Sequence, residues 1–292
     1  MAKKNLDSAY LDAFILNALI EDIGDGDHTS LACIPSHSKA KATLLVKENG
    51  VLAGLDLTKK IIHHVDPTLK LKTYFKDGST IKKGDIVFDL YGSAHSILKA
   101  ERLLLNCMQR MSGIATYTAQ LVKQCDGTNA KVIDTRKTTP GLRMLEKWAV
   151  RIGGGANHRF GLYDMMLIKD NHVDCAGGVS VALEKAMAYQ QRNKHLPIEI
   201  ETRNLNEVKE VLKTASKLKR GKLKRIMLDN FTPANLKKAV ILINAQFETE
   251  ASGGITAKTI RSFAKTGVDY ISVGALTHSV KSIDLSLKAH IS

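Results

Sequence analysis

Short apolar runs alternate with helical patterns over the second half of the chain. The runs are KVID, MMLI, PIEIE, RIML, FETEA and YISV, and each has the length of a buried strand. Alternation of strands and helices predicts a parallel sheet. Six such runs in about 160 residues fit both a closed barrel of strands and helices and a doubly wound open sheet, and the pattern does not choose between them.

The first 112 residues or so have a different pattern. Their β-rich pieces, such as KATLLVKENG and KTYFKDGSTIKKGDIVFDLYGS, are short and separated by Gly and Asp turns, which predicts a small sheet in an α+β layer. A helix is expected from Ala94 onward because apolar residues recur there at spacings of three and four. We expect Gly113 to break or bend this helix.

Composition places the chain among ordinary globular proteins. With 292 residues, 44% hydrophobic residues, 25% charged residues and 5 Pro, it can bury a large core, which excludes a disordered or fibrous protein. The four cysteines are scattered without a CxxC pair, which favours a reducing compartment. No run of about 18 apolar residues occurs, and the start MAKKNLDSAYLDAFILNALIED indicates an amphipathic helix rather than a targeting signal, so we expect no membrane span and a cytoplasmic protein.

The net charge of +14 favours anionic partners, which include phosphorylated metabolites, acidic small molecules and nucleic acid. The stretch KTASKLKRGKLKR, residues 213–225, is the best argument for nucleic acid. No aromatic residue interrupts it, however, and only 5% of the chain is aromatic, so stacking platforms for bases are lacking. We interpret this stretch as a solvated helix and loop and expect no nucleic-acid partner.

Polar residues follow several of the predicted strands at the point where each strand ends. The sequence places Thr135, Arg136 and Lys137 after KVID, Lys169 after MMLI, Glu201 at the end of PIEIE and Asp229 after RIML. In parallel α/β folds the ligand site lies at this edge, because the loops converge there and the following helices direct their positive N-termini toward it. A single charged loop is usually only solvated, but four in succession predict a site.

The last two strand ends predict a phosphate-binding site. FETEA leads into Ser252, Gly253 and Gly254, with Thr256 as the expected N-cap of a helix, and YISV leads into Gly274 and Ala275. Glycine leaves backbone N–H groups open to a ligand, and a helix N-terminus adds unpaired donors with partial positive charge. In barrels of this class, phosphate frequently binds after the last two strands.

The candidate site combines cations and acids. Its basic members are Arg136, Lys137, His158, Arg159 and Lys169. Together they predict a substrate with several negative groups. Arg159 follows the segment GGGANH, which we expect to be a ligand-closing loop. Glu201, which shares a strand face with Glu199, and Asp229 could hold Mg²⁺, stabilise a developing positive charge, or simply pair with basic residues.

The residues of this site carry a family resemblance. DTRKTTPGLRMLEKWAVRIGGGANHRFGLYDMMLIKDNH, residues 134–172, resembles the signature stretch of the quinolinate phosphoribosyltransferases, also called carboxylating nicotinate-nucleotide pyrophosphorylases. The similarity continues through EDIGDGDHTS, AERLLLNCMQRMSGIAT, EIETRNL, IMLDNF, EASGGI and ISVGALTHS, and it covers nearly the whole chain in order. One departure is the sequence ASKLKRGKLKR before IMLDN, where relatives commonly have a short Gly-Ala-Asp turn.

The resemblance implies a fold and an assembly. It implies an N-terminal α/β sandwich domain over residues 1–113, an incomplete α/β barrel as the catalytic domain over residues 114–280, and a C-terminal tail, residues 281–292, that packs back toward the first domain. It also implies a homodimer, which could assemble further, in which Arg102 enters the active site of the partner.

The resemblance also assigns roles to residues. Lys137 matches the active-site lysine, and Glu201 and Asp229 match the acidic pair near the ribose and the Mg²⁺ ion, which is held directly or through water. The positions that match quinolinate binding, together with Thr135 beside them, are Arg102, Arg136, His158, Arg159 and Lys169. The phosphate loops match Ser252, Gly253, Gly254, Val273, Gly274 and Ala275, and we add His278.

The activity implied is transfer of a phosphoribosyl group from phosphoribosyl pyrophosphate to quinolinate with loss of CO₂, a step of NAD biosynthesis. No cofactor other than Mg²⁺ is expected, because the ribosylated ring nitrogen can accept the electrons that the departing carboxylate releases. A related pyrophosphorylase acting on another nitrogen heterocycle is the nearest alternative, and a nucleic-acid-binding protein is a distant one.

Overall fold

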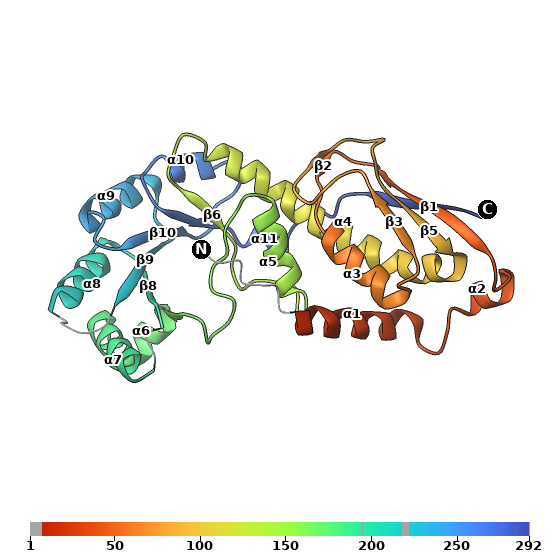
Figure 1. Cartoon of the computed structure of the whole chain (residues 1–292). Coiled ribbons are helices and arrows are strands. Elements are labelled where there is room, and N and C mark those ends of the chain that lie inside the picture. Colours follow the sequence, from red (N-terminus) through yellow and green to blue (C-terminus); the bar gives the residue numbers. More distant parts are fainter. Residues whose placement is uncertain (1–7, 194–195, 218–221, 292) are drawn as a thin grey trace. The chain divides into compact units, whose positions relative to one another are not determined.

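The computed structural model describes residues 8–193, 196–217 and 222–291. By internal contacts the chain forms two compact units. The first contains residues 1–117, 139–153 and 280–292, and the second contains residues 118–138 and 154–279. Figure 1 labels the elements of both units, and each unit is described by itself.

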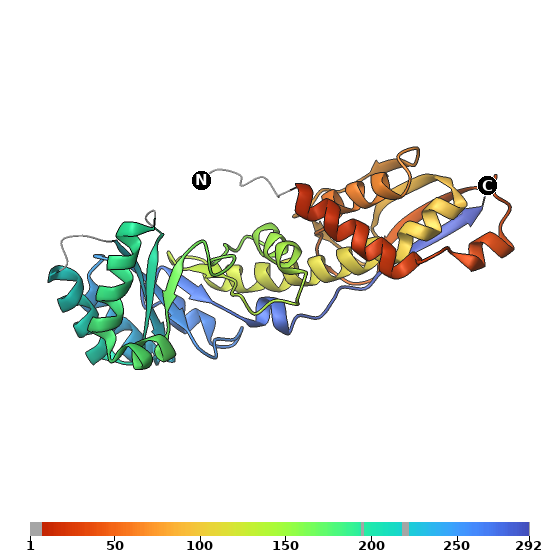
Figure 2. The same ribbon diagram turned by 90° about the horizontal axis from the view of Figure 1, so that it is seen from below.

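The first unit is built on a four-stranded antiparallel sheet with the order β12-β1-β5-β3. The last strand of the chain thus lies beside the first, as Figure 2 also shows. The sheet strands are β1 (Lys39–Val46), β3 (Lys70–Thr73), β5 (Ile86–Ser93) and β12 (Leu285–Ile291). A two-stranded sheet pairs β2 (Gly50–Val51) with β4 (Thr80–Ile81). The helices are α1 (Ser8–Ile23), α2 (His28–Cys33), α3 (Leu55–Val65), α5 (Arg143–Ile152) and most of α4 (Ala94–Gln124).

Alternation along β1 separates a buried face from a polar face. Ala40, Ala42 and Leu44 are buried, whereas Lys41 and Thr43 point to the other side. On that polar side lies the nearly buried carboxylate of Asp89, the acceptor for the hydroxyls of Thr43, Tyr74 and Tyr91 and the ion-pair partner of Lys41. The hydrophobic core of this unit therefore lies on one face of its sheet.

Helix α4 runs without a break from Ala94 to Gln124, so the predicted break at Gly113 is wrong. A Cβ atom at Gly113 would lie 2.2 Å from the carbonyl oxygen of Lys281. Nearby, the backbone N–H of Ile283 donates to the carbonyl of Gln109 at 3.1 Å. The glycine therefore permits the close approach of the C-terminal segment.

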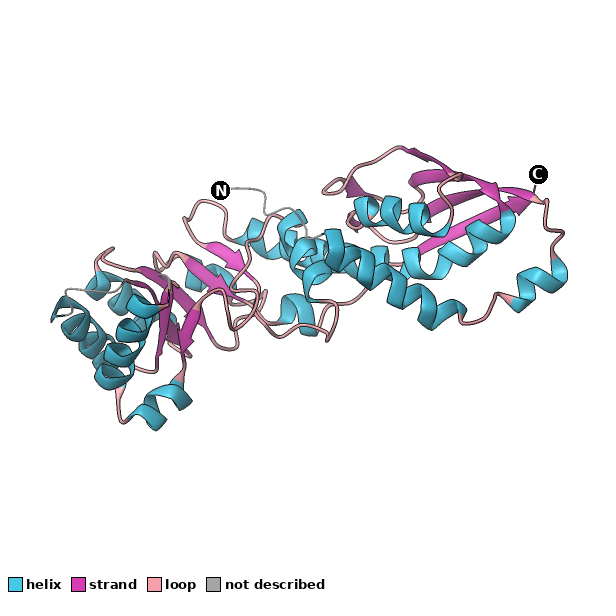
Figure 3. Cartoon of the chain, turned by 60° about the horizontal axis from the view of Figure 1, so that its bottom comes forward, coloured by secondary structure: helices cyan, strands magenta, loops and turns pink. Residues whose placement is uncertain are grey.

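The second unit contains a six-stranded parallel sheet with the order β6-β11-β10-β9-β8-β7. Its strands correspond to the six apolar runs of the sequence and are β6 (Lys131–Ile133), β7 (Met166–Ile168), β8 (Ile198–Thr202), β9 (Leu223–Asp229), β10 (Glu248–Ser252) and β11 (Tyr270–Ser272). Its helices lie outside the strands (Figure 3) and are α6 (Asp170–Ala176), α7 (Val179–Arg192), α8 (Leu205–Lys217), α9 (Pro233–Ile243), α10 (Ile260–Ala264) and α11 (Ala275–His278).

The strand order identifies an incomplete barrel. Strands β7 to β11 are neighbours in the order of the sequence, and the first strand of the set, β6, pairs with the last, β11. A doubly wound sheet would instead reverse its order in the middle. Within the described residues no ladder joins β6 to β7, so the barrel is open between them. The predicted fold class, a sandwich-like α/β domain with an incomplete α/β barrel, is confirmed.

Two further predictions concern the helix at the start of the chain and the membrane spans. The helix expected at the start of the chain is α1, and residues 1–7 lie outside the described residues. Among the described helices none is both long and apolar enough to cross a membrane.

Candidate active site at the carboxyl edge of the parallel sheet

The carboxyl ends of the barrel strands bring most of the predicted site residues to one edge of the second unit. Thr135, Arg136 and Lys137 follow β6, Lys169 follows β7, and Asp229 ends β9. Glu201 is the fourth residue of β8 and pairs in register with Met227, two residues before Asp229. Parallel pairing of these strands therefore produces the cluster that the sequence predicts.

Arg159 is the most buried cation of this edge. Its side chain donates from Nη1 to the carbonyl oxygen of Met165 at 3.0 Å, whereas its Nε is buried without an acceptor among the described residues. Burial, and next the positive charge of Arg136, lowers the pKa of Arg159, although the guanidinium stays charged. Two neighbouring guanidinium groups, one of them desolvated, form a strong attraction for an anion.

The segment before Arg159 is held firmly against β6. The buried carboxylate of Asp134 accepts the backbone N–H of His158 at 2.9 Å and the side-chain amide of Asn157 at 2.5 Å. Ala156 forms a parallel bridge with Ile133. The last residues of GGGANH therefore extend the edge of the sheet, and the closing of this segment on a ligand stays a prediction. The role of Asp134 could not be predicted from the sequence, because there it is one more polar residue after a strand.

The acidic pair lies on the two neighbouring strands β8 and β9. The Glu201 side chain is 8% exposed, and its Oε2 lies 3.4 Å from Nζ of Lys169. Burial raises the pKa of Glu201, Lys169 opposes that rise, and the negative charge of Asp229 adds to it. Two carboxylates that repel each other at a half-open edge supply the hard oxygen ligands that suit Mg²⁺, and the remaining ligands would come from substrate and water. The donor set therefore fits the ion.

The first predicted phosphate loop adjoins Asp229, one member of this acidic pair. Ser252 pairs in register with Asp229, and the backbone N–H of Asn230 donates to the Ser252 carbonyl at 2.9 Å. Gly253 has a φ of +98°, and a Cβ there would lie 2.2 Å from Oδ1 of Asn230. The predicted N-cap at Thr256 is wrong, since α10 begins only at Ile260 after a turn closed by the Thr256 carbonyl. This loop consequently offers backbone N–H groups without an adjoining helix N-terminus.

The second predicted phosphate loop adjoins the chain after β6. Val273 is buried and Gly274 and Ala275 lead into α11. The hydroxyl of Thr277 donates to the carbonyl oxygen of Lys137 at 2.7 Å. A Cβ at Gly274 would lie 3.1 Å from the ring of His278 and 3.3 Å from Cδ of Lys137. The structure therefore brings Lys137, His278 and this loop together.

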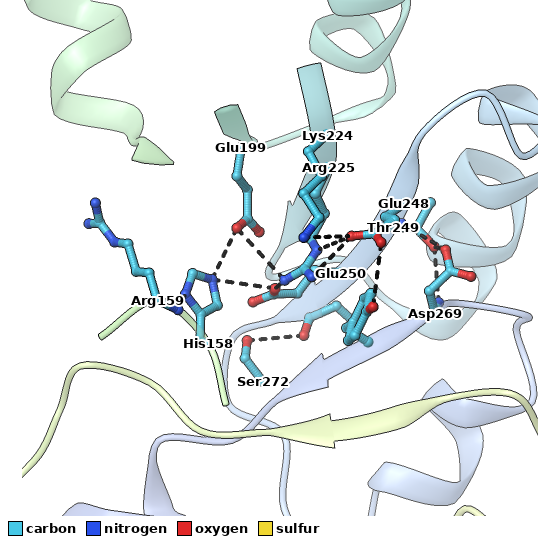
Figure 4. Close-up of polar contacts among 12 residues, drawn as sticks. His158, Arg159, Glu199, Lys224, Arg225, Glu248, Thr249, Glu250, Asp269 and Ser272 are labelled. Atoms are coloured by element: carbon cyan, nitrogen blue, oxygen red, sulfur yellow. Dashed lines mark hydrogen bonds and ion pairs between the residues drawn. The ribbon is translucent and has the colours of Figure 1, made fainter. Parts of the chain in front are cut away.

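The interior of the barrel holds an ionic cluster that the sequence does not reveal (Figure 4). His158 Nε2 lies 3.0 Å from Oε2 of Glu199 and 3.5 Å from Oε2 of Glu250, and the latter accepts a 2.7 Å hydrogen bond from Arg225 Nη1. The exposed fraction of these four side chains is at most 7%. The structure thus places the His158 ring among buried acids, whereas the Arg159 guanidinium points away from them (Figure 4).

This cluster corrects the interpretation of residues 213–225. Residues up to Lys217 belong to α8, residues 218–221 lie outside the described residues, and Leu223 begins β9. Arg225, expected in a solvated stretch, is buried and pairs with three glutamates, Glu199, Glu248 and Glu250. The signal available in the sequence was the period-two spacing of acids in PIEIE and FETEA, which marks one face of each strand.

Arg102 is the one predicted site residue outside the second unit. It lies on α4 in the first unit, and its side chain is exposed.

Comparisons with known proteins agree with the motifs. Family models of the quinolinate phosphoribosyl transferase N-terminal and C-terminal domains match residues 27–112 and 114–288. The chain is 50% identical over 289 residues to the chloroplastic carboxylating nicotinate-nucleotide pyrophosphorylase of Oryza sativa subsp. japonica, covering 95% of this chain and 77% of that protein. It is 42% identical over 273 residues to the probable carboxylating nicotinate-nucleotide pyrophosphorylase of Bacillus subtilis, covering 94% and 91%.

A solved structure has the same fold. The crystal structure of NadC from Streptococcus pyogenes superposes with a TM-score of 0.91 at 38% identity, covering 99% of this chain and all of that one. The resemblance inferred from the motifs is confirmed.

Proposed function

The chain belongs to the quinolinate phosphoribosyltransferase family, and from that premise we propose that it transfers a phosphoribosyl group from phosphoribosyl pyrophosphate to quinolinate. The products are nicotinate mononucleotide, pyrophosphate and CO₂, and the reaction is a step in de novo NAD biosynthesis. Relatives carrying the names quinolinate phosphoribosyltransferase and carboxylating nicotinate-nucleotide pyrophosphorylase support this assignment.

One observation of the structure carries the proposal: the buried guanidinium of Arg159, on which the positive charge of Arg136 also acts, lies in the unit whose strand ends carry the acidic pair and both glycine loops. Quinolinate is a pyridine dicarboxylate, and a carboxylate is the acceptor that the buried Nε of Arg159 lacks within the described residues. Arg136 and Thr135, after β6, and Lys169, after β7, bind the same substrate. The loops at Gly253 and Gly274 bind the phosphate groups of the second substrate through backbone N–H groups.

Ribosyl transfer requires charge stabilisation at two places. As pyrophosphate leaves C1 of the ribose, the sugar gains oxocarbenium character, and the ionised carboxylates of Glu201 and Asp229 stabilise it. Lys137, whose side chain adjoins Gly274 and His278, neutralises the departing phosphate oxygens. When bound by Glu201 and Asp229, Mg²⁺ adds positive charge beside the pyrophosphate. The pyridine nitrogen then attacks C1.

Decarboxylation follows from the charge of the product ring. Once the nitrogen carries the ribose it is positively charged, so the adjacent ring carbon can keep the electron pair when the C2 carboxylate leaves as CO₂. Arg136 and Arg159 orient the two carboxylates, and a proton replaces the lost group at C2. The substrate thus serves as its own electron acceptor.

The direct experiment incubates the purified protein with quinolinate, phosphoribosyl pyrophosphate and Mg²⁺. We expect equimolar nicotinate mononucleotide and CO₂, the latter followed with quinolinate labelled at the C2 carboxylate. Nicotinate in place of quinolinate is the matched control, because it lacks the second carboxylate. Turnover of nicotinate at an equal rate, or no CO₂ release, would reject the assignment.

We further propose a homodimer in which Arg102 completes the site of the partner protomer. The exposure of Arg102 on α4, where a second protomer can reach it, supports this assembly. Inactive Arg102→Ala and Lys137→Ala proteins should regain about a quarter of wild-type activity after random subunit exchange, because half of the dimers are mixed and each has one intact site. If mixing restores nothing although the subunits exchange, each protomer uses its own Arg102.

A cytoplasmic location is also proposed, since all four cysteines are free thiols and two of them, Cys107 and Cys125, are buried. The Oryza and Arabidopsis relatives are named chloroplastic, so the test is fractionation of the native host. Recovery of the protein in an organelle or membrane fraction would contradict the proposal.

A further inference from the structure

The proposed reaction leaves the buried cluster behind His158 without a role. Its members come from three strands and one loop: Glu199 of β8, Arg225 of β9, Glu250 of β10 and His158 from the segment that extends β6. Each is fully or almost fully buried, and keeping so many ionisable groups from water is costly unless their charges compensate.

The hydrogen bonds of His158 define its protonation. Its Nδ1 accepts the backbone N–H of Arg159 at 2.7 Å, so Nδ1 carries no proton and the ring is the neutral Nε2–H form. That Nε2–H faces the Oε2 atoms of Glu199 and Glu250 at 3.0 and 3.5 Å. In this form the histidine adds no positive charge to the cluster, and its Nε2 lies within ion-pair distance of both acids.

The charges of Arg225, Glu199 and Glu250 balance only if one of the two glutamates binds a proton. Arg225 supplies the positive charge that contacts both carboxyl groups, at 2.7 Å for Glu250 and 3.8 Å for Glu199. Among the described residues, neither oxygen of Glu199 and only one oxygen of Glu250 has a hydrogen-bond donor. Two carboxyl groups that face each other without other donors are satisfied when one of them is protonated and donates to the other.

The remaining neighbours do not change this count. Glu248, on the same strand as Glu250, also pairs with Arg225, and its side chain is 36% exposed. The ring of Tyr270 on β11 stacks on the Arg225 guanidinium at 3.8 Å. Arg159 adds a more distant positive charge. Burial, and next the negative charge of Glu199, raises the pKa of Glu250 to about 8. Burial raises the pKa of Glu199 too, but its hydrogen bond with Glu250 opposes that rise. The two facing carboxyl groups therefore hold one proton between them, and the electrostatics place it on Glu250.

The same three side chains, His158, Glu199 and Glu250, also have the spacing of a metal site, with ligand atoms all within 4.8 Å of one another. The guanidinium of Arg225 argues against an ion, because it already donates to Oε2 of Glu250 and would repel a second cation at this depth. A proton satisfies the oxygens without adding a net positive charge beyond that of Arg225.

We propose that Glu250 is a positioning residue kept in its protonated form, and that its hydrogen bond to Glu199 holds the His158 ring and, through the backbone of Arg159, the guanidinium that binds the acidic substrate. Ionisation of Glu250 places two negative charges beside one arginine and reorients the histidine. The link to substrate rests on the proposed function, whereas the protonation of Glu250 does not.

The kinetic test compares wild type with Glu250→Gln, an isosteric variant that imitates the neutral acid. In the wild type the KM for quinolinate should rise about tenfold between pH 7 and pH 9 as Glu250 ionises. Glu250→Gln should keep a KM within about threefold of wild type at pH 7 and lose that rise. Glu248→Gln contacts the same arginine but not His158, so it is the matched control and should keep the wild-type pH profile.

A stability test separates this inference from the proposed function, because it needs no substrate. Since the pKa of Glu250 is higher in the folded state than its ordinary 4.5, its contribution to stability is complete below that value and is lost as pH rises to about 8. The melting temperature of the wild type should therefore fall relative to that of Glu250→Gln between pH 5 and pH 8. The infrared band of a protonated carboxyl group should be present at pH 6 and absent in the variant.

Several outcomes would overturn the inference. One is an alkaline KM rise that Glu250→Gln retains; another is a difference in melting temperature between the two proteins that does not change with pH. Stoichiometric metal that Glu250→Gln releases while Glu201→Gln retains it would show a cation in place of the proton. If neither substrate assay works but the stability and infrared results hold, the proposed function fails and the protonated Glu250 stands.

Discussion

The hydroxyl of Thr277 donates a 2.7 Å hydrogen bond to the backbone carbonyl of Lys137. The bond joins two strand ends that are 140 residues apart in sequence, and Thr277 is completely buried. The bond holds the backbone of Lys137 against the second phosphate loop. Lys137 is the residue that we assign to the departing pyrophosphate.

Replacing Thr277 with valine removes this bond at nearly constant volume. We expect the free energy of unfolding to fall by about 1 kcal/mol and the KM for phosphoribosyl pyrophosphate to rise about fivefold. Steady-state kinetics and denaturant titration measure both. Thr277→Ser retains the hydroxyl and should bind substrate like the wild type, so equal losses in both variants would assign the effect to packing.

Arg159→Lys tests the two-pronged grip on the substrate. A lysine keeps the charge but loses the planar pair of donors, so the KM for quinolinate should rise about tenfold to a hundredfold. The exposed Arg192 of α7 offers the matched control, and Arg192→Lys should change nothing measurable. An unchanged affinity in Arg159→Lys would mean that the guanidinium does not bind the carboxylates in two places.

Asp89 should make the first unit sensitive to acid. Burial opposes its ionisation, but hydrogen bonds from Thr43, Lys41 and Tyr74 lower the pKa of Asp89 from 3.8 to about 2. A lowered pKa contributes stability that is present above pH 3.8 and is lost as pH falls through 2.

Asp89→Asn should therefore lower the free energy of unfolding by about 2 kcal/mol at pH 7, with the difference from wild type shrinking between pH 4 and pH 2. Chemical unfolding at several pH values measures this. Asp56→Asn is the control, because it removes only an exposed ion pair with Lys59. It should lower the free energy of unfolding by less than about 1 kcal/mol, independently of Asp89.

Gly113→Ala should destabilise the protein although alanine favours helices. The added methyl group would meet the carbonyl oxygen of Lys281, and relieving that overlap should cost about 1 to 3 kcal/mol. Asn106→Ala on the exposed side of the same helix should be neutral or slightly stabilising. A stabilised Gly113→Ala protein would show that the C-terminal segment moves aside freely.

Local patterns predict much of this fold. All six strands of the parallel sheet coincide with the apolar runs, because each run is bounded by turn residues and buried on both faces. Whether the strands form an incomplete barrel or a doubly wound sheet depends on the pairing of β6 with β11, a contact across more than 130 residues that no local period encodes. The surroundings of Gly113 were missed for the same reason, since the segment that packs against it, at Lys281, is distant in sequence.

The candidate site divides in a similar way. Charged residues after strands, such as Lys169 and Asp229, are visible in the sequence because parallel strands share an edge. The roles of Arg225 and Glu250 are not visible, because each is one charged residue among others in the sequence. Only the register of β8, β9 and β10 makes them a buried ion pair.

The pairing of β12 with β1 has a consequence for biosynthesis. Residues 285–291 supply the edge strand of the first sheet, yet the ribosome makes them only after the entire second unit. The first sheet therefore stays incomplete, with one edge of β1 unpaired, until translation has passed residue 291. Nascent chains stalled before that point should be held by chaperones, which gives the final strand control over when the whole protein matures.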